Sequence, residues 1–233
     1  SGDVTFDGNL LSGLSAQELR EFWGTGMAMI FQDPMTSLNP VRKIGTQIGE
    51  ALRIRLGMSK DDANKKSAEL LRLVRVPDPD ATLNKYPFQL SGGMRQRVMI
   101  AIALACDPKL LFADEPTTAL DVTVQAQILE LLDDLRKSLN MSMVLVTHDL
   151  GVVAGHTDRV IVMYAGEVVE SAKTTDLFAN MRMPYTEALF KSIPTLDTPT
   201  GTRLPTIEGR VPDPTQENPG CSFASRCSYV QEK

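Results

Sequence analysis

The sequence predicts an α/β fold with a mostly parallel sheet, and three short apolar runs are the main reason. They occupy residues 27–31, 110–113 and 143–146, and each has the length and composition of a strand that is buried on both faces. Segments with helical spacing of apolar residues separate these runs, and such alternation is typical of parallel sheets. With 233 residues, the chain can form one good core and a small appendage.

Further elements can be assigned around this sheet. Helical spacing covers residues 44–56, 59–75, 95–106 with Ser91 as N-cap, and 122–139. A short strand that ends in a turn is expected at 4–8, and strands at 160–163 and 167–170 flank residues 164–166 like a hairpin. The helical span 41–89 interrupts the alternation, so we interpret it as an inserted subdomain. From about residue 184 the character changes, because seven of the 14 prolines lie in the last 50 residues. This predicts an irregular extension without an independent core.

The composition excludes several functional classes. The net charge is -5 and the isoelectric point is about 5.1, whereas a general nucleic-acid binder or a protein that binds anionic membranes would show a basic face. No apolar run approaches the roughly 20 residues that span a bilayer. The three cysteines, Cys106, Cys221 and Cys227, are too few for a disulfide framework, which favours a cytosolic setting.

Two adjacent carboxylates follow the second apolar run. Asp114 and Glu115 come directly after residues 110–113, and side chains alternate along a strand, so the two point in different directions. One can reach a Mg²⁺ shell while the other faces an attacking water, which are the roles that phosphoryl transfer requires. The alternative is a strand end followed by a helix cap.

Three other motifs carry groups that can contact a ligand. Ser91, Gly92 and Gly93 begin a helix, where backbone N–H groups and the helix dipole favour an anion; the alternative is an ordinary glycine-rich helix start. His148 follows the third run and is well placed to contact a ligand above the sheet, although a lone histidine can equally be structural. Gln32 follows the first run and can orient a water or complete a Mg²⁺ shell.

Taken together, the four motifs occur in the order and spacing of the ATP-binding cassette (ABC) ATPases, which have the P-loop NTPase fold. The resemblance spans residues 1–175. Its parts are Gln32 as the Q-loop glutamine, Ser91-Gly92-Gly93 as the signature, Asp114 and Glu115 as the Walker B pair, residues 117–121 as the D-loop and His148 as the switch histidine.

The resemblance implies a role for each of these residues. Asp114 and Gln32 contact Mg²⁺, directly or through water; Glu115 polarises the attacking water; and His148 contacts the γ-phosphate. The residues expected to serve ATP across a dimer seam are Ser91, Gly92, Gly93, Gln96 and Asp121.

Several longer stretches resemble a subgroup of this family, the importers of oligopeptides, dipeptides and nickel. They are residues 31–40, 93–97, 162–170 and 184–189. The resemblance implies an ATPase that energises peptide import from the cytoplasmic face of the cell membrane. Its expected partners are a second, different ATPase subunit, permease subunits and, indirectly, an extracytoplasmic solute-binding protein, with no nucleic acid. Soluble ABC-type ATPases of translation or DNA repair share the site motifs and are the alternative.

We expect a domain organisation of an ATPase domain over residues 1–175, with its helical subdomain at about 41–106, and an extension over 176–233. No G-x-x-x-x-G-K-[ST] run occurs in the chain. We therefore expect that a phosphate-binding segment precedes residue 1, and that the complete protein hydrolyses ATP while this chain alone does not. A truncated chain with a binding or regulatory role is the other interpretation.

Cys221 and Cys227 form a C-x5-C run that resembles the extension of peptide-importer ATPases, where further cysteines usually follow. Two thiolates cannot complete a structural zinc or iron–sulfur site, which usually needs four ligands. For this chain we expect two free thiols. For the complete protein, a [4Fe–4S] cluster or Zn²⁺ that staples the extension is the open alternative.

Overall fold

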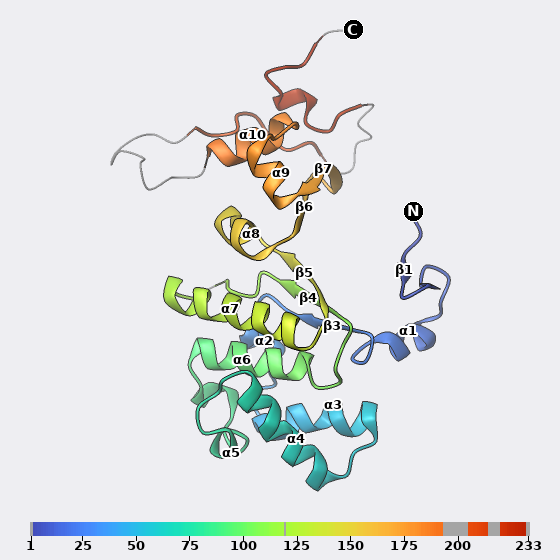
Figure 1. The fold of residues 1–233 in the computed structure, drawn as a ribbon, viewed down its shortest axis with the longest axis vertical. Helices are drawn as coiled ribbons and strands as arrows, with labels where there is room; N and C mark the ends of the chain where they lie inside the picture. The colour runs from blue at the N-terminus through green and yellow to red at the C-terminus, as the bar shows by residue number, and fades with distance from the viewer. Residues whose placement is uncertain (1, 119, 193–204, 214–219, 232–233) are drawn as a thin grey trace. The chain divides into compact units, whose positions relative to one another are not determined.

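The computed structural model describes residues 2–118, 120–192, 205–213 and 220–231. The chain divides after His148 into two compact units, residues 1–148 and 149–233. Both are drawn in Figure 1, and each is described by itself below.

A three-stranded parallel sheet lies at the centre of the first unit. Its strands are β3 (Met27–Ile30), β4 (Leu110–Asp114) and β5 (Ser142–Val146), in the order β3-β4-β5. Ile30 pairs with Ala113, and Asp114 pairs with Val146, so the three strands end at one edge of the sheet (Figure 1). The parallel sheet predicted from the three apolar runs is confirmed.

A small hairpin precedes this sheet. The short strand predicted at residues 4–8 ends in the expected turn, where Asp7 and Gly8 both have positive φ. The paired segments are β1 (Thr5–Phe6) and β2 (Asn9–Leu10), which run antiparallel.

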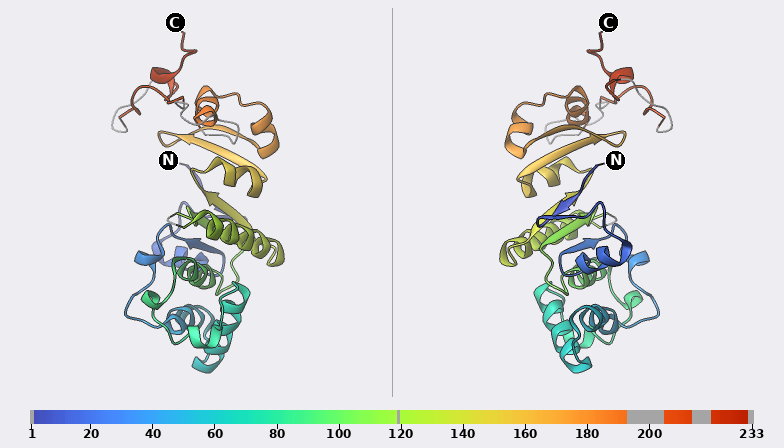
Figure 2. Two further views of the ribbon diagram at one scale, coloured as in Figure 1. Left: turned by 90° about the vertical axis from the view of Figure 1, so that its left-hand side faces the viewer. Right: turned by 90° about the vertical axis from the view of Figure 1, so that its right-hand side faces the viewer.

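Helices cover the sheet of the first unit and extend away from it. They are α1 (Ala16–Phe22), α2 (Pro34–Ser37), α3 (Ile44–Leu56), α4 (Lys60–Leu73), α5 (Pro79–Thr82), the 3-10 turn η1 (Pro87–Gln89), α6 (Gly92–Ala103) and α7 (Val122–Ser138). Figure 2 shows α6 and α7 beside the sheet, with α3, α4 and α5 beyond them. Residues 41–89 thus form the helical insertion that the sequence predicts.

One continuous core joins the sheet to the insertion. Its fully buried side chains come from α3, α4, α6, β4 and α7, among them Ile48, Leu71, Ile100, Leu111 and Ile128. Burying a side chain of this size contributes about 1.5–3 kcal/mol. The second half of α6, from Val98 to Ala103, is apolar and mostly buried in this core.

The second unit has a two-stranded sheet and several short helices. Its elements are α8 (Leu150–His156), β6 (Arg159–Tyr164), β7 (Glu167–Lys173), α9 (Thr174–Ala179), α10 (Pro184–Lys191) and the 3-10 turn η2 (Ala224–Arg226). Strands β6 and β7 are antiparallel, and positive φ angles at Ala165 and Gly166 form the tight turn between them. The predicted hairpin is confirmed.

The C-terminal extension is less irregular than predicted. From residue 184 its described parts contain α10 and η2, and Phe223 is only 2% exposed. The Phe223 ring lies 5.3 Å from that of Tyr164 and 5.4 Å from that of Tyr185. Because an aromatic side chain buries a large apolar area, this cluster gives the extension a small core. Most of the proline-rich stretch between residues 195 and 219 lies outside the described residues.

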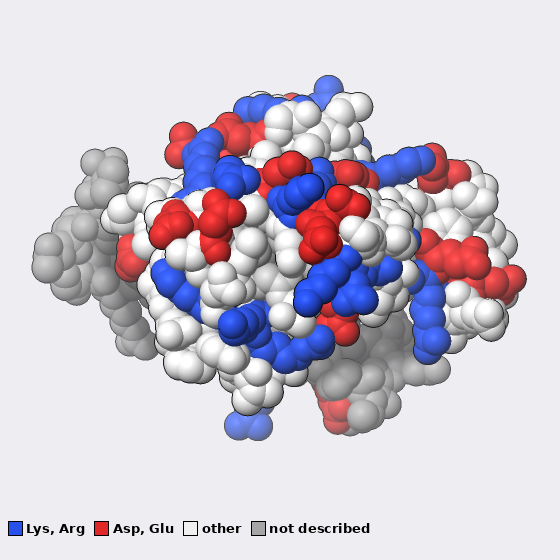
Figure 3. Space-filling model, turned by 90° about the horizontal axis from the view of Figure 1, so that it is seen from below, with Lys and Arg blue, Asp and Glu red and all other residues white. Residues whose placement is uncertain are grey.

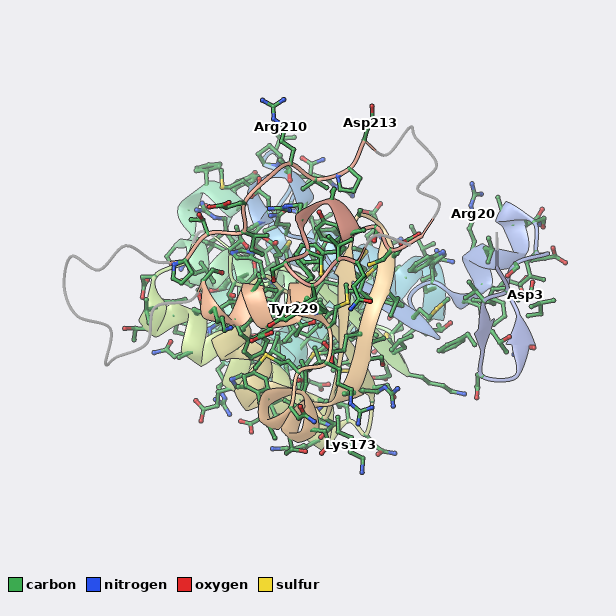
Figure 4. All side chains as sticks on the ribbon, turned by 90° about the horizontal axis from the view of Figure 1, so that it is seen from above. Asp3, Arg20, Lys173, Arg210, Asp213 and Tyr229 are labelled. Atoms are coloured by element: carbon green, nitrogen blue, oxygen red, sulfur yellow. The ribbon has the colours of Figure 1, made fainter. Side chains whose placement is uncertain are left out.

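Arg226 adds polar contacts to the same cluster. It donates to the carbonyl oxygens of Ile207 and Glu208 at 2.6 and 2.7 Å, and to the Tyr164 hydroxyl at 3.2 Å. In the view from above, Arg210 projects outward from the segment 205–213, which contains Ile207 and Glu208 (Figure 4). The segment from 205 to 213 is therefore tied to the cysteine-containing segment through one guanidinium group.

Surface charges are mixed on the side of the helical insertion. On the face seen from below, Lys and Arg side chains alternate with Asp and Glu side chains (Figure 3). The first unit also carries ion pairs such as Arg72–Asp80 and Arg75–Asp134, at 2.8 and 2.6 Å. Within the described part of the chain, no helix is both long and apolar enough to cross a bilayer.

Candidate functional site

Three predicted site residues meet at the edge where the parallel strands end. Gln32 follows β3, Glu115 follows β4 and His148 follows β5. The Gln32 Nε2 lies 2.7 Å from Glu115 Oε2, and His148 Nδ1 lies 2.9 Å from Glu115 Oε1. Because the carboxyl ends of parallel strands share one edge, residues distant in sequence converge there.

The Glu115 carboxylate is the centre of this network. Its Oε1 accepts from His148, and its Oε2 accepts from Gln32 and, at 2.8 Å, from the hydroxyl of Thr118. The His148 hydrogen bond, followed by that of Thr118, lowers the pKa of Glu115 below its ordinary value. Since an ionised carboxylate only accepts, His148 Nδ1 carries the proton in this contact. The Nε2 of this exposed ring is then left for a ligand.

The backbone of Glu115 has an unusual conformation. Its φ is +42°, although a residue before proline normally adopts an extended backbone and non-glycine residues rarely have positive φ. The Glu115 N–H donates to the Val146 carbonyl oxygen at 2.9 Å, and Thr118 N–H donates to the Glu115 carbonyl oxygen at 3.1 Å. Such strain costs on the order of 1–3 kcal/mol and concentrates at functional sites.

Asp114 and Gln32 supply free oxygen atoms next to this network. Asp114 is half-buried at the end of β4, and within the described residues its carboxylate makes no hydrogen bond or ion pair. The Gln32 amide nitrogen is used by Glu115, which leaves the amide oxygen as an acceptor. Carboxylate and amide oxygens are the ligands that Mg²⁺ takes in proteins. These two residues therefore have the donor atoms that a magnesium site needs.

The predicted signature residues lie at the start of α6. Ser91 is exposed and caps this helix, since its hydroxyl accepts from the Met94 N–H at 3.4 Å. A Cβ at Gly93 would lie 2.8 Å from Val124 Cγ1, and one at Gly92 would lie 3.5 Å from Leu120. The glycines therefore let α6 approach α7 closely, a packing reason that the sequence motif did not reveal.

Asp121, the predicted seam residue, caps the neighbouring helix. Its carboxylate accepts from the Val124 N–H at 3.0 Å at the start of α7. Because Gly93 approaches Val124 closely, the N-terminal ends of α6 and α7 lie side by side. Each end has an exposed capping side chain, Ser91 or Asp121.

Gln96 requires a correction. We expected it to contact ATP across a dimer seam, but its side chain is only 1% exposed and lies inside α6. A side chain buried at this depth cannot reach a nucleotide held by another subunit. Its Nε2 has no hydrogen-bond partner within the described chain.

A groove lies on the first unit outside this network. It has a volume of about 400 Å³ and is lined by the segment before β3 and by α3 and α6, including Trp23, Ala51, Ile54, Arg55, Ile102 and Cys106. Ile54 is 71% exposed and Trp23 is 42% exposed. Burial raises the pKa of the Cys106 thiol.

The two C-terminal cysteines do not form a metal site among the described residues. Cys221 is exposed and Cys227 is half-buried, and no three His, Cys, Asp or Glu side chains gather around an ion position in the described parts of the chain. A structural zinc or iron–sulfur site usually needs four ligands. The described residues therefore do not fit such a centre.

Comparison with models of protein families identifies the family of this chain. The model of a family described as "ABC transporter" matches residues 1–118, and that of a family described as "Oligopeptide/dipeptide transporter, C-terminal region" matches residues 169–233. This chain belongs to the ABC transporter family. The family and the P-loop NTPase fold predicted from the motifs are confirmed, and with them an ATP-binding ATPase.

Individual relatives agree with this assignment. The chain is 55% identical to the "Probable peptide ABC transporter ATP-binding protein y4tR" of Sinorhizobium fredii, over 98% of this chain and 68% of the relative. It is 50% identical to the oligopeptide transport ATP-binding protein AppD of Bacillus subtilis, over 100% of this chain and 70% of that protein. The chain thus spans about two thirds of the length of these relatives.

A solved structure supports the same family and shows how such a cassette assembles. The ATP-binding cassette MJ0796, in a dimeric post-hydrolysis state bound to ADP and Pi, is 31% identical and has a TM-score of 0.67. The match covers 75% of this chain and 74% of that cassette.

Proposed function

We propose that this chain is the ATP-hydrolysing part of an ABC importer for peptides, located at the cytoplasmic face of the membrane. The observation that carries the proposal is the convergence of Gln32, Glu115 and His148 from three strand ends, next to the free carboxylate of Asp114. The peptide class rests on the C-terminal region and on the names of the relatives.

The four side chains divide the tasks of phosphoryl transfer. Glu115, ionised because its pKa is lowered, polarises the attacking water, and His148 presents Nε2 to the γ-phosphate. Asp114 and the amide oxygen of Gln32 would hold Mg²⁺, which when bound neutralises charge on the phosphates. Catalysis of this kind depends on positioning and electrostatics more than on covalent chemistry by the protein.

A second subunit would complete the nucleotide site. We infer that the starts of α6 and α7, with Ser91, Gly92, Gly93 and Asp121, face ATP held by another cassette. Exposure of the Ser91 and Asp121 side chains supports this inference, as does the dimeric state of the related cassette. From the importer resemblance, we propose that the second subunit differs from this one.

The groove beside α3 and α6 is our candidate contact for the permease. It combines exposed apolar side chains, Trp23 and Ile54, with the polar groups of Glu50 and Arg55. An amphipathic helix can insert into a groove of this kind. A solute-binding protein outside the membrane would then interact with the permease and not with this chain.

The cysteine-ligated centre stays a prediction for the complete protein. Phe223 and Arg226 hold the cysteine-containing segment through ring contacts and hydrogen bonds. Visible absorption by the complete protein that is lost on Cys221→Ser would support a cluster. A colourless, metal-free complete protein would end the idea.

Peptide uptake by reconstituted vesicles tests the proposal. The complete ATPase pair and permease would be placed in proteoliposomes with a peptide-loaded binding protein outside and Mg-ATP inside. We expect uptake of a labelled peptide with the wild type, no uptake with Glu115→Gln and normal uptake with Glu130→Gln, an exposed glutamate of α7. ATP-independent uptake, or uptake of sugars in place of peptides, would contradict it.

A further inference from the structure

We propose that Thr118 is a positioning residue for Glu115: its hydroxyl holds the carboxylate independently of the loops that carry Gln32 and His148. The inference rests on the proposed role of Glu115 in polarising water. It assigns a function to a side chain that the sequence motifs left without one.

The three partners of Glu115 differ in how they reach it. Gln32 and His148 arrive from separate loops, 83 and 33 residues away in the chain. Thr118 lies three residues from Glu115 in the same turn, and its Oγ1 donates to Oε2 at 2.8 Å. Only the Thr118 contact is therefore local to the loop that carries the carboxylate.

The two distant partners also serve the nucleotide. In the proposed function, the amide oxygen of Gln32 faces Mg²⁺ and Nε2 of His148 faces the γ-phosphate, while Gln32 Nε2 and His148 Nδ1 donate to Glu115. Any movement of these two loops toward the ligands changes the direction of both donors. The Thr118 contact does not depend on that movement, so it limits the rotational freedom of the glutamate side chain at the step where its direction matters.

The backbone keeps Thr118 in place during such a movement. Thr118 N–H donates to the Glu115 carbonyl oxygen at 3.1 Å, and the Glu115 N–H is held by Val146 of β5 at 2.9 Å. These bonds fix the positive-φ conformation of Glu115 and the turn that follows it. Because the turn sets the distance between the two residues, the hydroxyl can orient the carboxylate without moving itself.

Steady-state ATP hydrolysis by the complete transporter tests the inference. For Thr118→Val we expect kcat to fall roughly 3- to 10-fold, as for a lost hydrogen bond to a charged group at a partly solvated site, while KM for ATP changes less than about twofold. Thr118→Ser, which keeps the hydroxyl, should retain at least about half of the wild-type kcat. Thr175→Val is the matched control, because Thr175 also donates to a carboxylate, that of Asp176, on α9 of the second unit; its kcat should not change.

The results for Glu115→Gln and Thr118→Val together distinguish a failure of this inference from a failure of the proposed function. If Glu115→Gln hydrolyses ATP like the wild type, the role of Glu115 fails and the inference with it. If Glu115→Gln is inactive while Thr118→Val equals the wild type, only the inference fails. Equal losses in Thr118→Val and Thr118→Ser, or a raised KM with unchanged kcat, would also overturn it. Should the valine variant not fold, judged by its thermal unfolding, Thr118→Ala provides the same comparison.

Discussion

Gln32 and Glu115 are 83 residues apart in the chain, yet the Gln32 amide donates to the Glu115 carboxylate across 2.7 Å. The contact exists because β3 and β4 are parallel neighbours whose ends are in register at Ile30 and Ala113. It joins the loop before the helical insertion to the residue proposed to polarise water.

Gly93→Ala should lower the stability of the first unit. The new Cβ would lie 2.8 Å from Val124 Cγ1, and overpacking of this kind costs typically about 1–3 kcal/mol. The gain of up to about 1 kcal/mol from higher helix propensity offsets only part of this. Chemical denaturation of the purified chain would measure the change in free energy of unfolding.

The contact with Val124 provides its own control. In the double variant Gly93→Ala/Val124→Ala the clash is removed, so we expect a favourable coupling energy of at least about 0.5 kcal/mol. Gly155→Ala, in α8 with open space around the new methyl group, should be neutral or stabilising. Additive effects of the two changes at the α6–α7 contact would show that the glycine is not needed for packing.

Phe223→Ala should release the cysteine-containing segment. The ring is 2% exposed between Tyr164 and Tyr185, and truncating a buried phenylalanine costs about 3–5 kcal/mol. We expect fast hydrogen exchange at the amides of Ala224 and Arg226, which donate within the local turn. Tyr229→Ala, at a residue that is 65% exposed and is labelled in Figure 4, should leave their exchange unchanged. Unaltered exchange in Phe223→Ala would mean that something else holds the segment.

The three cysteines should react with iodoacetamide at very different rates. Burial raises the pKa of Cys106, so at pH 8 a smaller fraction of this thiol is in the reactive thiolate form than at an exposed cysteine. Burial also limits the access of the reagent to the sulfur atom. We expect Cys221 to be alkylated first and Cys106 last, as measured by peptide mass spectrometry. Because the pKa is raised, the Cys106 rate should keep increasing with pH above the range in which an ordinary thiol levels off.

Unfolding in urea is the control for this experiment. It should bring the Cys106 rate up to that of the two C-terminal cysteines. Rapid alkylation of Cys106 in the native protein at pH 8 would contradict the burial of its thiol against α3.

The sequence predicted the sheet and the meeting of its loops because the relevant signals are local. Buried parallel strands are short apolar runs, and the polar residues that follow them share one edge of the sheet. Thr118 was missed because its contact depends on the positive φ of Glu115, and a residue before proline is expected to be extended. The residue types around Glu115 do not indicate that it adopts a positive φ.

Two other differences have equally specific causes. The role expected for Gln96 came from the family resemblance alone, and in the fold its side chain is buried between the partly exposed Arg95 and Arg97. Phe223 is an isolated aromatic residue in a segment without periodicity, so only the fold reveals its contacts with Tyr164 and Tyr185. In both cases tertiary packing overrides the local pattern.

The most direct test of the account is ATP cleavage in a single turnover by the complete transporter. A rapid-quench measurement would compare the wild type with Glu115→Gln and with Glu130→Gln as the matched control. We predict that Glu115→Gln binds ATP as tightly as the wild type but cleaves it at least about 100-fold more slowly, while Glu130→Gln cleaves it normally. Cleavage by Glu115→Gln at the wild-type rate would contradict the assignment of this strand edge as the hydrolytic site.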